Sequence, residues 1–182
     1  GGATGKTGGI LVEKDYQDLE VWYPILRLRE AGHKVLVIGT GSAPSYEGKF
    51  GYPITVDTTA DKVAAKELDG IIVPGGWAPD FLRRYKAVTD LVRDCHTQGK
   101  VVGAICHAGW VLVSARILKG QTVTCFSAIK DDVEAAGAIW VDKEVQVTGN
   151  LVTARKPDDL PAFMREILGL LAGERGGVER SA

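Results

Sequence analysis

The sequence lacks the features that mark several specialised classes of protein. It has no excess of charge of one sign, because 22 basic residues stand against 23 acidic ones and the net charge is −1. The basic residues are scattered rather than gathered in a stripe, so we expect no nucleic-acid partner. No uninterrupted apolar run approaches the roughly 20 residues that a membrane-spanning helix needs, so we expect no membrane partner either.

Cysteine is also scarce. The three cysteines, Cys95, Cys106 and Cys125, are odd in number and far apart, and no CxxC pair is present. Zinc and dithiol sites need closely spaced cysteines, and disulfide frameworks need more of them. His33 and His96 have no metal-like companions at short spacing. The sequence therefore predicts no metal, no cofactor and a location in the reducing cytoplasm.

What is present is the composition of one ordinary globular domain. The chain has 182 residues, 45% of them hydrophobic and 25% charged, which is enough to bury a substantial core. The opening residues lack the apolar segment of a secretory signal. We expect residues 1–8 to be a flexible terminus or a tag, residues 9–173 to form a single domain, and residues 174–182 to be a flexible tail.

Short apolar runs alternate with longer stretches of helical periodicity, which predicts a mostly parallel sheet covered by helices. The expected strands lie at 10–12, 34–38, 54–56, 70–73, 101–105 and 123–125, with a hairpin made of 145–147 and 151–153. The expected helices lie at 18–31, 61–68, 87–98, 107–118 and 131–136, and from 157 past 171.

The most informative feature is a turn at Cys106, where a continuous apolar strand stops and a helix begins. Ala104 and Ala108 lie two positions on either side, and small side chains are needed there because a sharp strand-to-helix turn crowds its neighbours. Free N–H groups and the dipole at the start of a helix favour a thiolate, so we expect the sulfur to be ionised near neutral pH. Cys95 and Cys125 lie in apolar periodic segments and are expected to be structural.

The same turn predicts an oxyanion hole. The backbone N–H of His107 is expected to point out of the sheet, and Gly75 and Gly76 follow a neighbouring strand at its carboxyl end. Ligands of open α/β sheets bind beyond that end of the strands. N–H donors gathered there would stabilise negative charge that develops on a carbonyl oxygen.

Several motifs occur in a fixed order along the chain. They are Asp18-Leu19-Glu20 with Pro24, Glu30-Ala31-Gly32-His33, Ile71-Ile72-Val73-Pro74-Gly75-Gly76, Ala104-Ile105-Cys106-His107, Ser114-Ala115, Ile129-Lys130-Asp131-Asp132 and Pro157-Asp158-Asp159-Leu160. With them the chain resembles the ThiJ/PfpI superfamily, close to its PfpI intracellular-protease branch, from Gly9 to about Leu171. The resemblance implies a flavodoxin-like three-layer sandwich with a mostly parallel central sheet, similar to class I glutamine amidotransferases, and a homodimer or higher oligomer.

The resemblance also implies roles for three residues. Cys106 matches the nucleophile, Glu20 matches a helix-borne glutamate that touches the thiol, and His107 matches the histidine beside the nucleophile. A protonated glutamate can hydrogen-bond a thiolate, and a histidine can act as general base when a carboxylate orients its ring. Without the resemblance, Glu20 is equally well explained as a solvated carboxylate and His107 as an exposed histidine at a helix start.

The chain departs from the peptidase pattern at two positions. Asp80 stands where that pattern carries a glutamate contributed across an interface by the neighbouring subunit, and its side chain is one methylene shorter. Gln17 stands where relatives often carry glutamate. Displacing a carboxylate by about an ångström weakens a hydrogen bond, so both changes argue against a working protease triad.

Three functions fit these residues. The first is a stress-response cysteine hydrolase, either peptidase-like or of the deglycase or glyoxalase type, whose substrate is a peptide or a small reactive carbonyl compound. The second is an oxidative-stress sensor in which Cys106 is oxidised to sulfenic or sulfinic acid. The third is a chaperone in which Cys106 is incidental. The residues support the first two almost equally, because both need the same activated thiol, and no motif supports the third.

Overall fold

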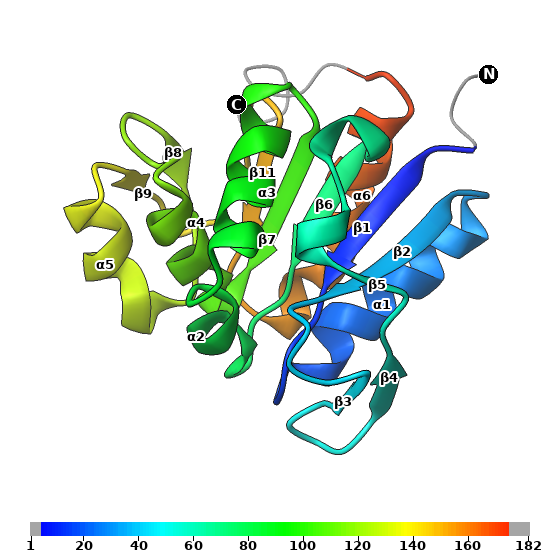
Figure 1. Ribbon diagram of the computed structural model, residues 1–182. Helices are drawn as coiled ribbons and strands as arrows, with labels where there is room; N and C mark the ends of the chain where they lie inside the picture. The colour runs from blue at the N-terminus through cyan, green and yellow to red at the C-terminus, as the bar shows by residue number, and fades with distance from the viewer. Residues whose placement is uncertain (1–4, 175–182) are drawn as a thin grey trace.

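A computed structural model describes residues 5–174, and its central feature is a seven-stranded sheet with the order β10-β11-β7-β6-β1-β2-β5 (Figure 1). The strands are β1 Thr7–Leu11, β2 Lys34–Gly39, β5 Thr58–Thr59, β6 Gly70–Val73, β7 Val101–Ile105, β10 Val145–Thr148 and β11 Leu151–Ala154. Strand β10 is antiparallel to β11, and the other neighbouring pairs are parallel. The mostly parallel sheet and the predicted hairpin are confirmed.

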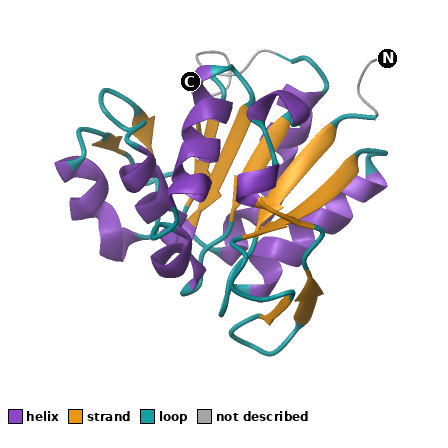
Figure 2. Cartoon of the chain, viewed as in Figure 1, coloured by secondary structure: helices purple, strands orange, loops and turns teal. Residues whose placement is uncertain are grey.

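Helices cover both faces of this sheet, giving a three-layer sandwich (Figures 1 and 2). On one face lie α1 and α6, and on the other lie α2, α3 and α4, with α5 packed beside α4. The helices are α1 Asp18–Glu30, α2 Ala78–Leu82, α3 Lys86–Thr97, α4 Gly109–Ala115, α5 Lys130–Ala135 and α6 Leu160–Leu171. Because both faces are covered, the central strands β6 and β7 are buried along their whole length, as their continuous apolar sequence predicts.

Two small sheets lie outside the main one. An antiparallel hairpin joins β3 Ser45–Glu47 to β4 Pro53–Thr55, and a parallel pair joins β8 Thr122–Val123 to β9 Ile139–Trp140. The strands predicted at 54–56 and 123–125 are therefore present in part. They pair locally and not with the main sheet.

Three predicted helices differ from the structure. The helix predicted at 61–68 is two separate 3₁₀ turns, Ala60–Lys62 and Ala65–Glu67, because Val63 and Ala64 adopt extended backbone between them. The helix predicted at 107–118 begins as a 3₁₀ turn and ends early at Arg116, whose φ is 60°. Two further 3₁₀ turns span Ser127–Ile129 and Pro157–Asp159, so the last predicted helix becomes a 3₁₀ turn followed by α6.

The folded part of the chain begins before residue 9, because Thr7 and Gly8 are hydrogen-bonded in register with Lys34 and Val35 of β2. Residues 1–4 and 175–182, which include most of the predicted flexible ends, lie outside the described residues. Within residues 5–174 no helix is both long enough and apolar enough to cross a bilayer. The same stretch holds no group of three acidic, histidine or cysteine side chains arranged for a metal ion.

The topology decides where a site can form. Strands β6 and β7 are parallel neighbours, so their carboxyl ends meet at one edge of the sheet. The chain leaves β6 through Gly75 and Gly76 and leaves β7 through Cys106. The residues predicted to carry chemistry are thereby brought together at the edge where ligands of such sheets bind.

Candidate active site

Cys106 occupies a strained turn directly after β7. Its φ is 63°, in the left-handed region that non-glycine residues rarely adopt, whereas Ile105 before it is extended. Ala104 and Ala108 are buried on either side, and a Cβ added to Gly109 would lie 3.0 Å from Ile129 Cδ1. The small flanking residues thus fit the crowding that the sequence predicts at this turn.

The sulfur faces a small cavity of about 200 Å³. Cys106 Sγ lies 3.3 Å from His107 Nδ1, and the backbone N–H groups of His107 and Gly76 hydrogen-bond the thiol. The cavity is lined by Gln17, Lys49, Gly76, Trp77, Cys106, His107, Phe126, Lys156 and Pro157. A space of this size admits a small carbonyl compound or one side chain, and not a folded polypeptide.

Glu20 reaches this turn from α1, and its side chain is fully buried. Its Oε1 accepts a hydrogen bond of 2.8 Å from the backbone N–H of Gly75, while Oε2 has no hydrogen-bond partner. A Cβ on Gly75 would lie 2.6 Å from Glu20 Oε1 and 3.2 Å from Cys106 Sγ. The glutamate and the sulfur therefore converge on the same glycine, which leaves them the necessary space.

Burial controls the protonation of Glu20. Loss of solvent raises the pKa of its carboxyl to about 8, opposed by the Gly75 N–H and by the positive charge of Lys49. At neutral pH the carboxyl is mainly protonated and can donate a hydrogen bond. The alternative interpretation of Glu20 as a solvated carboxylate is therefore wrong.

The resting thiol is protonated as well. Burial raises the pKa of Cys106 to about 12, and the Glu20 carboxylate adds to this rise once it is ionised above about pH 8, against the lowering effect of the His107 and Gly76 N–H groups. The prediction that the turn alone ionises the sulfur near neutral pH is therefore wrong. The amide hydrogens are present as predicted, but Cys106 is only 8% exposed, and the loss of water outweighs them.

His107 is placed to receive the thiol proton. Its ring stacks on Phe126 with centroids 4.9 Å apart and meets the edge of Trp110 at 5.2 Å. Burial, aided by the charge of Lys49, lowers the pKa of His107, so the imidazole is neutral and can act as a base at pH 7. Two aromatic rings, rather than a carboxylate, hold the imidazole in the described part of the chain.

Asp80 does not line the cavity within one chain. It lies on α2, where its carboxylate accepts a hydrogen bond of 2.8 Å from Arg84 and is half exposed. Its approach to His107 from a neighbouring subunit stays a prediction. Gln17 does line the cavity and caps α1, accepting a hydrogen bond from Leu19 N at 2.7 Å, so the position supplies a neutral amide.

The structure also alters the predicted oxyanion hole. The Gly75 N–H is already donated to Glu20 and is not available to a substrate. Gly76 has φ 75°, and a Cβ there would lie 2.4 Å from Gln17 N, so only glycine fits. The N–H groups of Gly76 and His107 remain as the two donors beside the sulfur.

Sequence reasoning missed two cations in the cavity, Lys49 and Lys156. Lys49 belongs to a loop fixed by the Asp18 carboxylate, which accepts hydrogen bonds of 2.9 Å from the N–H groups of Phe50 and Tyr52. No local pattern connects that loop to Cys106. Lys156 directly precedes the Pro157-Asp158-Asp159 motif, and this position was the one feature of the sequence that could have indicated that Lys156 lies near the site.

Comparisons with known proteins agree with this arrangement. Residues 9–170 match the family described as the DJ-1/PfpI family. The chain belongs to the DJ-1/PfpI family. The sequence identification of the ThiJ/PfpI superfamily and of its fold is thus confirmed.

Among the relatives is a protein named Deglycase PfpI from Pyrococcus furiosus, 42% identical over 161 residues, covering 88% of this chain and 96% of that protein. General stress protein 18 of Bacillus subtilis is 39% identical over 169 residues, covering 92% and 98%. A solved two-domain protein from Anabaena variabilis, with DJ-1/ThiJ/PfpI-like and ferritin-like domains, superposes with a TM-score of 0.90 at 38% identity. That match covers 93% of this chain and 48% of the other.

Proposed function

We propose that this protein is a stress-response cysteine hydrolase of the deglycase or glyoxalase type, acting on small reactive carbonyl compounds and on their adducts with amines or thiols. The observation that carries the proposal is the meeting of Cys106 Sγ, the neutral His107 ring at 3.3 Å and two N–H donors in one small cavity. The names of relatives such as Deglycase PfpI support the same chemistry.

The reaction begins with all three groups neutral. As Cys106 Sγ attacks the aldehyde carbon of a dicarbonyl such as methylglyoxal, the thiol proton passes to His107 Nδ1 and a carbon–sulfur bond forms. The carbonyl oxygen gains the negative charge, and the N–H groups of Gly76 and His107 stabilise it. The protonated Glu20, whose Oε2 has no other partner, can donate a hydrogen bond to the sulfur and stabilise negative charge on it.

The adduct then rearranges without an external oxidant. A base removes the proton from the former aldehyde carbon, and the electron pair of that C–H bond forms an enediol with the neighbouring ketone carbon. Protonation of the second carbon then leaves a thioester on the first carbon, which is oxidised, and an alcohol on the second, which is reduced. Water cleaves the carbon–sulfur bond, returns the proton to sulfur and releases a hydroxy acid. With a hemiaminal as substrate, Cys106 Sγ displaces the amine from the former aldehyde carbon: the carbon–sulfur bond forms, the carbon–nitrogen bond breaks, and the thiol proton leaves with the amine. The same rearrangement and hydrolysis then follow.

Peptide hydrolysis is a weaker candidate for the same cysteine. The cavity of about 200 Å³ is bordered by Trp77 and Phe126, and this leaves little room for a polypeptide on both sides of a scissile bond. Asp80 is held by Arg84 within the chain. A carboxylate to orient His107 would have to come from another subunit.

The test compares methylglyoxal turnover and peptide hydrolysis in three proteins: the wild-type, Cys106→Ala and Cys95→Ala, the last a matched loss of a buried thiol that does not line the cavity. We expect wild-type and Cys95→Ala to convert methylglyoxal to lactate, and Cys106→Ala to lose at least a thousand-fold in rate. Circular dichroism verifies that each variant is folded. Cys106-independent turnover, or peptide hydrolysis without carbonyl turnover, would refute the proposal.

Oxidation of Cys106 is the second candidate, because the same two N–H groups would stabilise a sulfenate or sulfinate oxygen. Mild peroxide treatment followed by mass spectrometry distinguishes the two. Oxygen added at Cys106 in a protein without carbonyl turnover would favour the sensor. A chaperone role instead predicts that Cys106→Ala still suppresses aggregation of a client protein.

We further propose that the chain self-associates and acts in the cytoplasm. Leu19, Leu26, Phe50 and Tyr52 are 56–76% exposed around an apolar groove beside α1, an arrangement typical of an interface. The three free cysteines are consistent with a reducing compartment. Sedimentation of wild-type and of a Leu19→Glu, Phe50→Glu double variant tests the interface, and a wild-type monomer would contradict it.

A further inference from the structure

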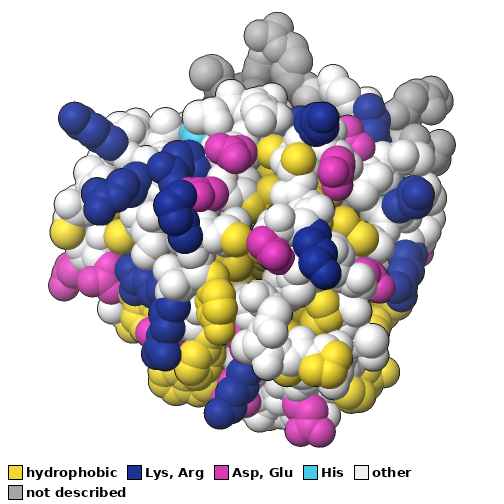
Figure 3. Space-filling view, viewed as in Figure 1, with side chains coloured by type: hydrophobic (Ala, Val, Ile, Leu, Met, Phe, Trp, Pro, Cys, Tyr) yellow, Lys and Arg dark blue, Asp and Glu magenta, His cyan; other side chains and the backbone are white. Residues whose placement is uncertain are grey.

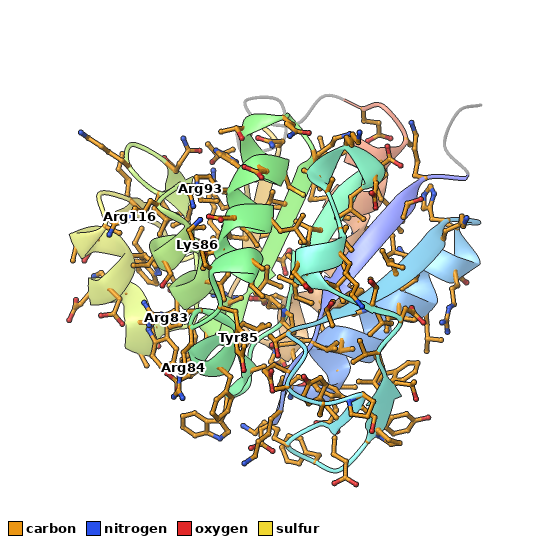
Figure 4. The ribbon with its side chains drawn as sticks, viewed as in Figure 1. Arg83, Arg84, Tyr85, Lys86, Arg93 and Arg116 are labelled. Atoms are coloured by element: carbon orange, nitrogen blue, oxygen red, sulfur yellow. The ribbon has the colours of Figure 1, made fainter. Side chains whose placement is uncertain are left out.

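A second cavity, of about 810 Å³, is lined by Trp110, whose ring also contacts His107 next to Cys106. It is formed where the end of α2, the end of α4 and α5 meet, and Arg83, Arg116 and Lys119 line it. Figure 4 labels Arg83 and Arg116 on the same side of α3, and Figure 3 shows basic side chains gathered on that part of the surface. The volume is that of a site for a small organic molecule rather than for a single ion.

The neighbouring cations are already neutralised, which sets this cavity apart. Arg84 pairs with Asp80, and both Lys86 and Arg93 pair with Asp90. Within residues 5–174 no ion pair involves Arg83, Arg116 or Lys119. The carboxylate of Asp132 also lines the cavity, where it accepts a hydrogen bond of 2.8 Å from Trp110 Nε1. Three cations and one carboxylate leave the cavity with a positive charge.

Arg83 is held ready to bind. Its Nε donates to Ser114 Oγ at 2.9 Å, and its guanidinium lies 5.6 Å from the centre of the Trp110 ring. These contacts fix the plane of the guanidinium and leave its two terminal nitrogens available. Such a preorganised fork suits the paired oxygens of a phosphate group, and the aromatic contact lowers the cost of ordering the side chain.

Arg116 occupies a backbone position that normally favours glycine. It ends α4 in the left-handed conformation with φ 60°. The helices α1, α3, α5 and α6 are instead followed by Gly32, Gly99, Gly137 and Gly173, all with positive φ. The chain therefore keeps a charged side chain beside the cavity at the one helix end where the backbone opposes it.

We propose that this cavity binds a small organic molecule carrying a phosphate group, with the phosphate on Arg83, Arg116 and Lys119. The walls contributed by Val113, Leu118, Ala135 and Ala136 would contact the carbon skeleton. The site is separate from the cysteine cavity. The two cavities share no lining residue.

Isothermal titration calorimetry with ribose 5-phosphate, ribose and inorganic phosphate tests the site. We expect ribose 5-phosphate to bind, ribose not to bind, and inorganic phosphate to bind at least ten-fold more weakly than ribose 5-phosphate. Arg83→Gln and Arg116→Gln should each weaken binding about ten-fold. Arg165→Gln, an equal loss of charge at an exposed position of α6 on the opposite face of the sheet, should change binding less than two-fold.

Cys106→Ala should bind ribose 5-phosphate like the wild-type protein, which separates this site from the proposed reaction. Circular dichroism controls for the folding of each variant. Equal binding of ribose, equal affinity for inorganic phosphate, equal losses in Arg116→Gln and Arg165→Gln, or no binding of ribose 5-phosphate at all would each overturn the proposal.

Discussion

Cys106 at its turn and Cys95 inside α3 provide an instructive comparison, because burial raises the pKa of both thiols to about 12. The two regions differ in what surrounds the sulfur. Cys106 has a neutral imidazole at 3.3 Å, two N–H donors and a cavity in front of it, while Cys95 is fully buried in α3. Readiness to react thus rests on a nearby acceptor for the proton and on access, and not on an ionised resting state.

The largest expected difference is in alkylation by iodoacetamide. We expect Cys106 to react at least a hundred-fold faster than Cys95 or Cys125, because the other two are 0% and 2% exposed and can react only when the fold opens. Peptide mass spectrometry over a time course measures the three rates. Similar rates at all three cysteines would remove the distinction.

Replacing His107 should make the reactivity of Cys106 more like that of Cys95. In His107→Gln the thiol loses its proton acceptor, so we expect turnover of methylglyoxal at pH 7 to fall about a hundred-fold. The remaining rate should rise with pH as hydroxide takes over the deprotonation. His96→Gln, a change in α3, is the matched control and should retain wild-type turnover. An unchanged rate in His107→Gln would exclude the histidine as the base.

Glu20 allows a test through stability. Its pKa in the folded chain is raised to about 8 from 4.5, so the folded state holds a proton that the unfolded state releases between these values. This contribution to stability is complete below about pH 4.5 and is lost as pH rises through about 8. Relative to Glu20→Gln, the wild-type free energy of unfolding should therefore fall by up to about 1.4 kcal/mol per pH unit between pH 5 and 8.

Urea titrations at several pH values measure this difference. Glu30→Gln, on the exposed end of the same helix, provides the control and should show no such slope. A difference between wild-type and Glu20→Gln that stays constant with pH would mean that Glu20 is ionised in the folded chain.

The smallest effect is expected at Asp80. Both side chains of its ion pair with Arg84 are exposed to solvent, so Asp80→Asn should change the free energy of unfolding by less than about 0.5 kcal/mol. Carbonyl turnover should change by less than three-fold. Steady-state kinetics and urea unfolding measure both. A loss of turnover above ten-fold would instead support a contribution of Asp80 across a subunit interface.

The sequence was sufficient to predict the sheet and the sharp turn that carries Cys106. Continuous apolar strands such as 101–105 have one physical explanation, and small residues around a cysteine at a strand end predict a sharp turn. The protonation state of Cys106 could not be predicted in the same way. Whether amide hydrogens or burial determines the pKa of Cys106 depends on solvent exposure, which is a property of the packed molecule.

Residues that enter the site from distant loops were also beyond the sequence. Lys49 reaches the cavity because Asp18, more than thirty positions away, fixes the backbone of the following loop. The split of the helix predicted at 61–68 has a different origin, since its few apolar positions do not form a helical stripe.

The left-handed backbone at position 106 has a consequence for the evolution of this fold. Alanine ordinarily stabilises a chain relative to glycine. Here the φ of 63° favours glycine, so the free energy of unfolding of Cys106→Gly should exceed that of Cys106→Ala by about 1 kcal/mol. Drift towards greater stability would thus tend to remove the thiol that we propose performs the chemistry. Keeping a thiol at this turn requires continued selection for what the thiol does.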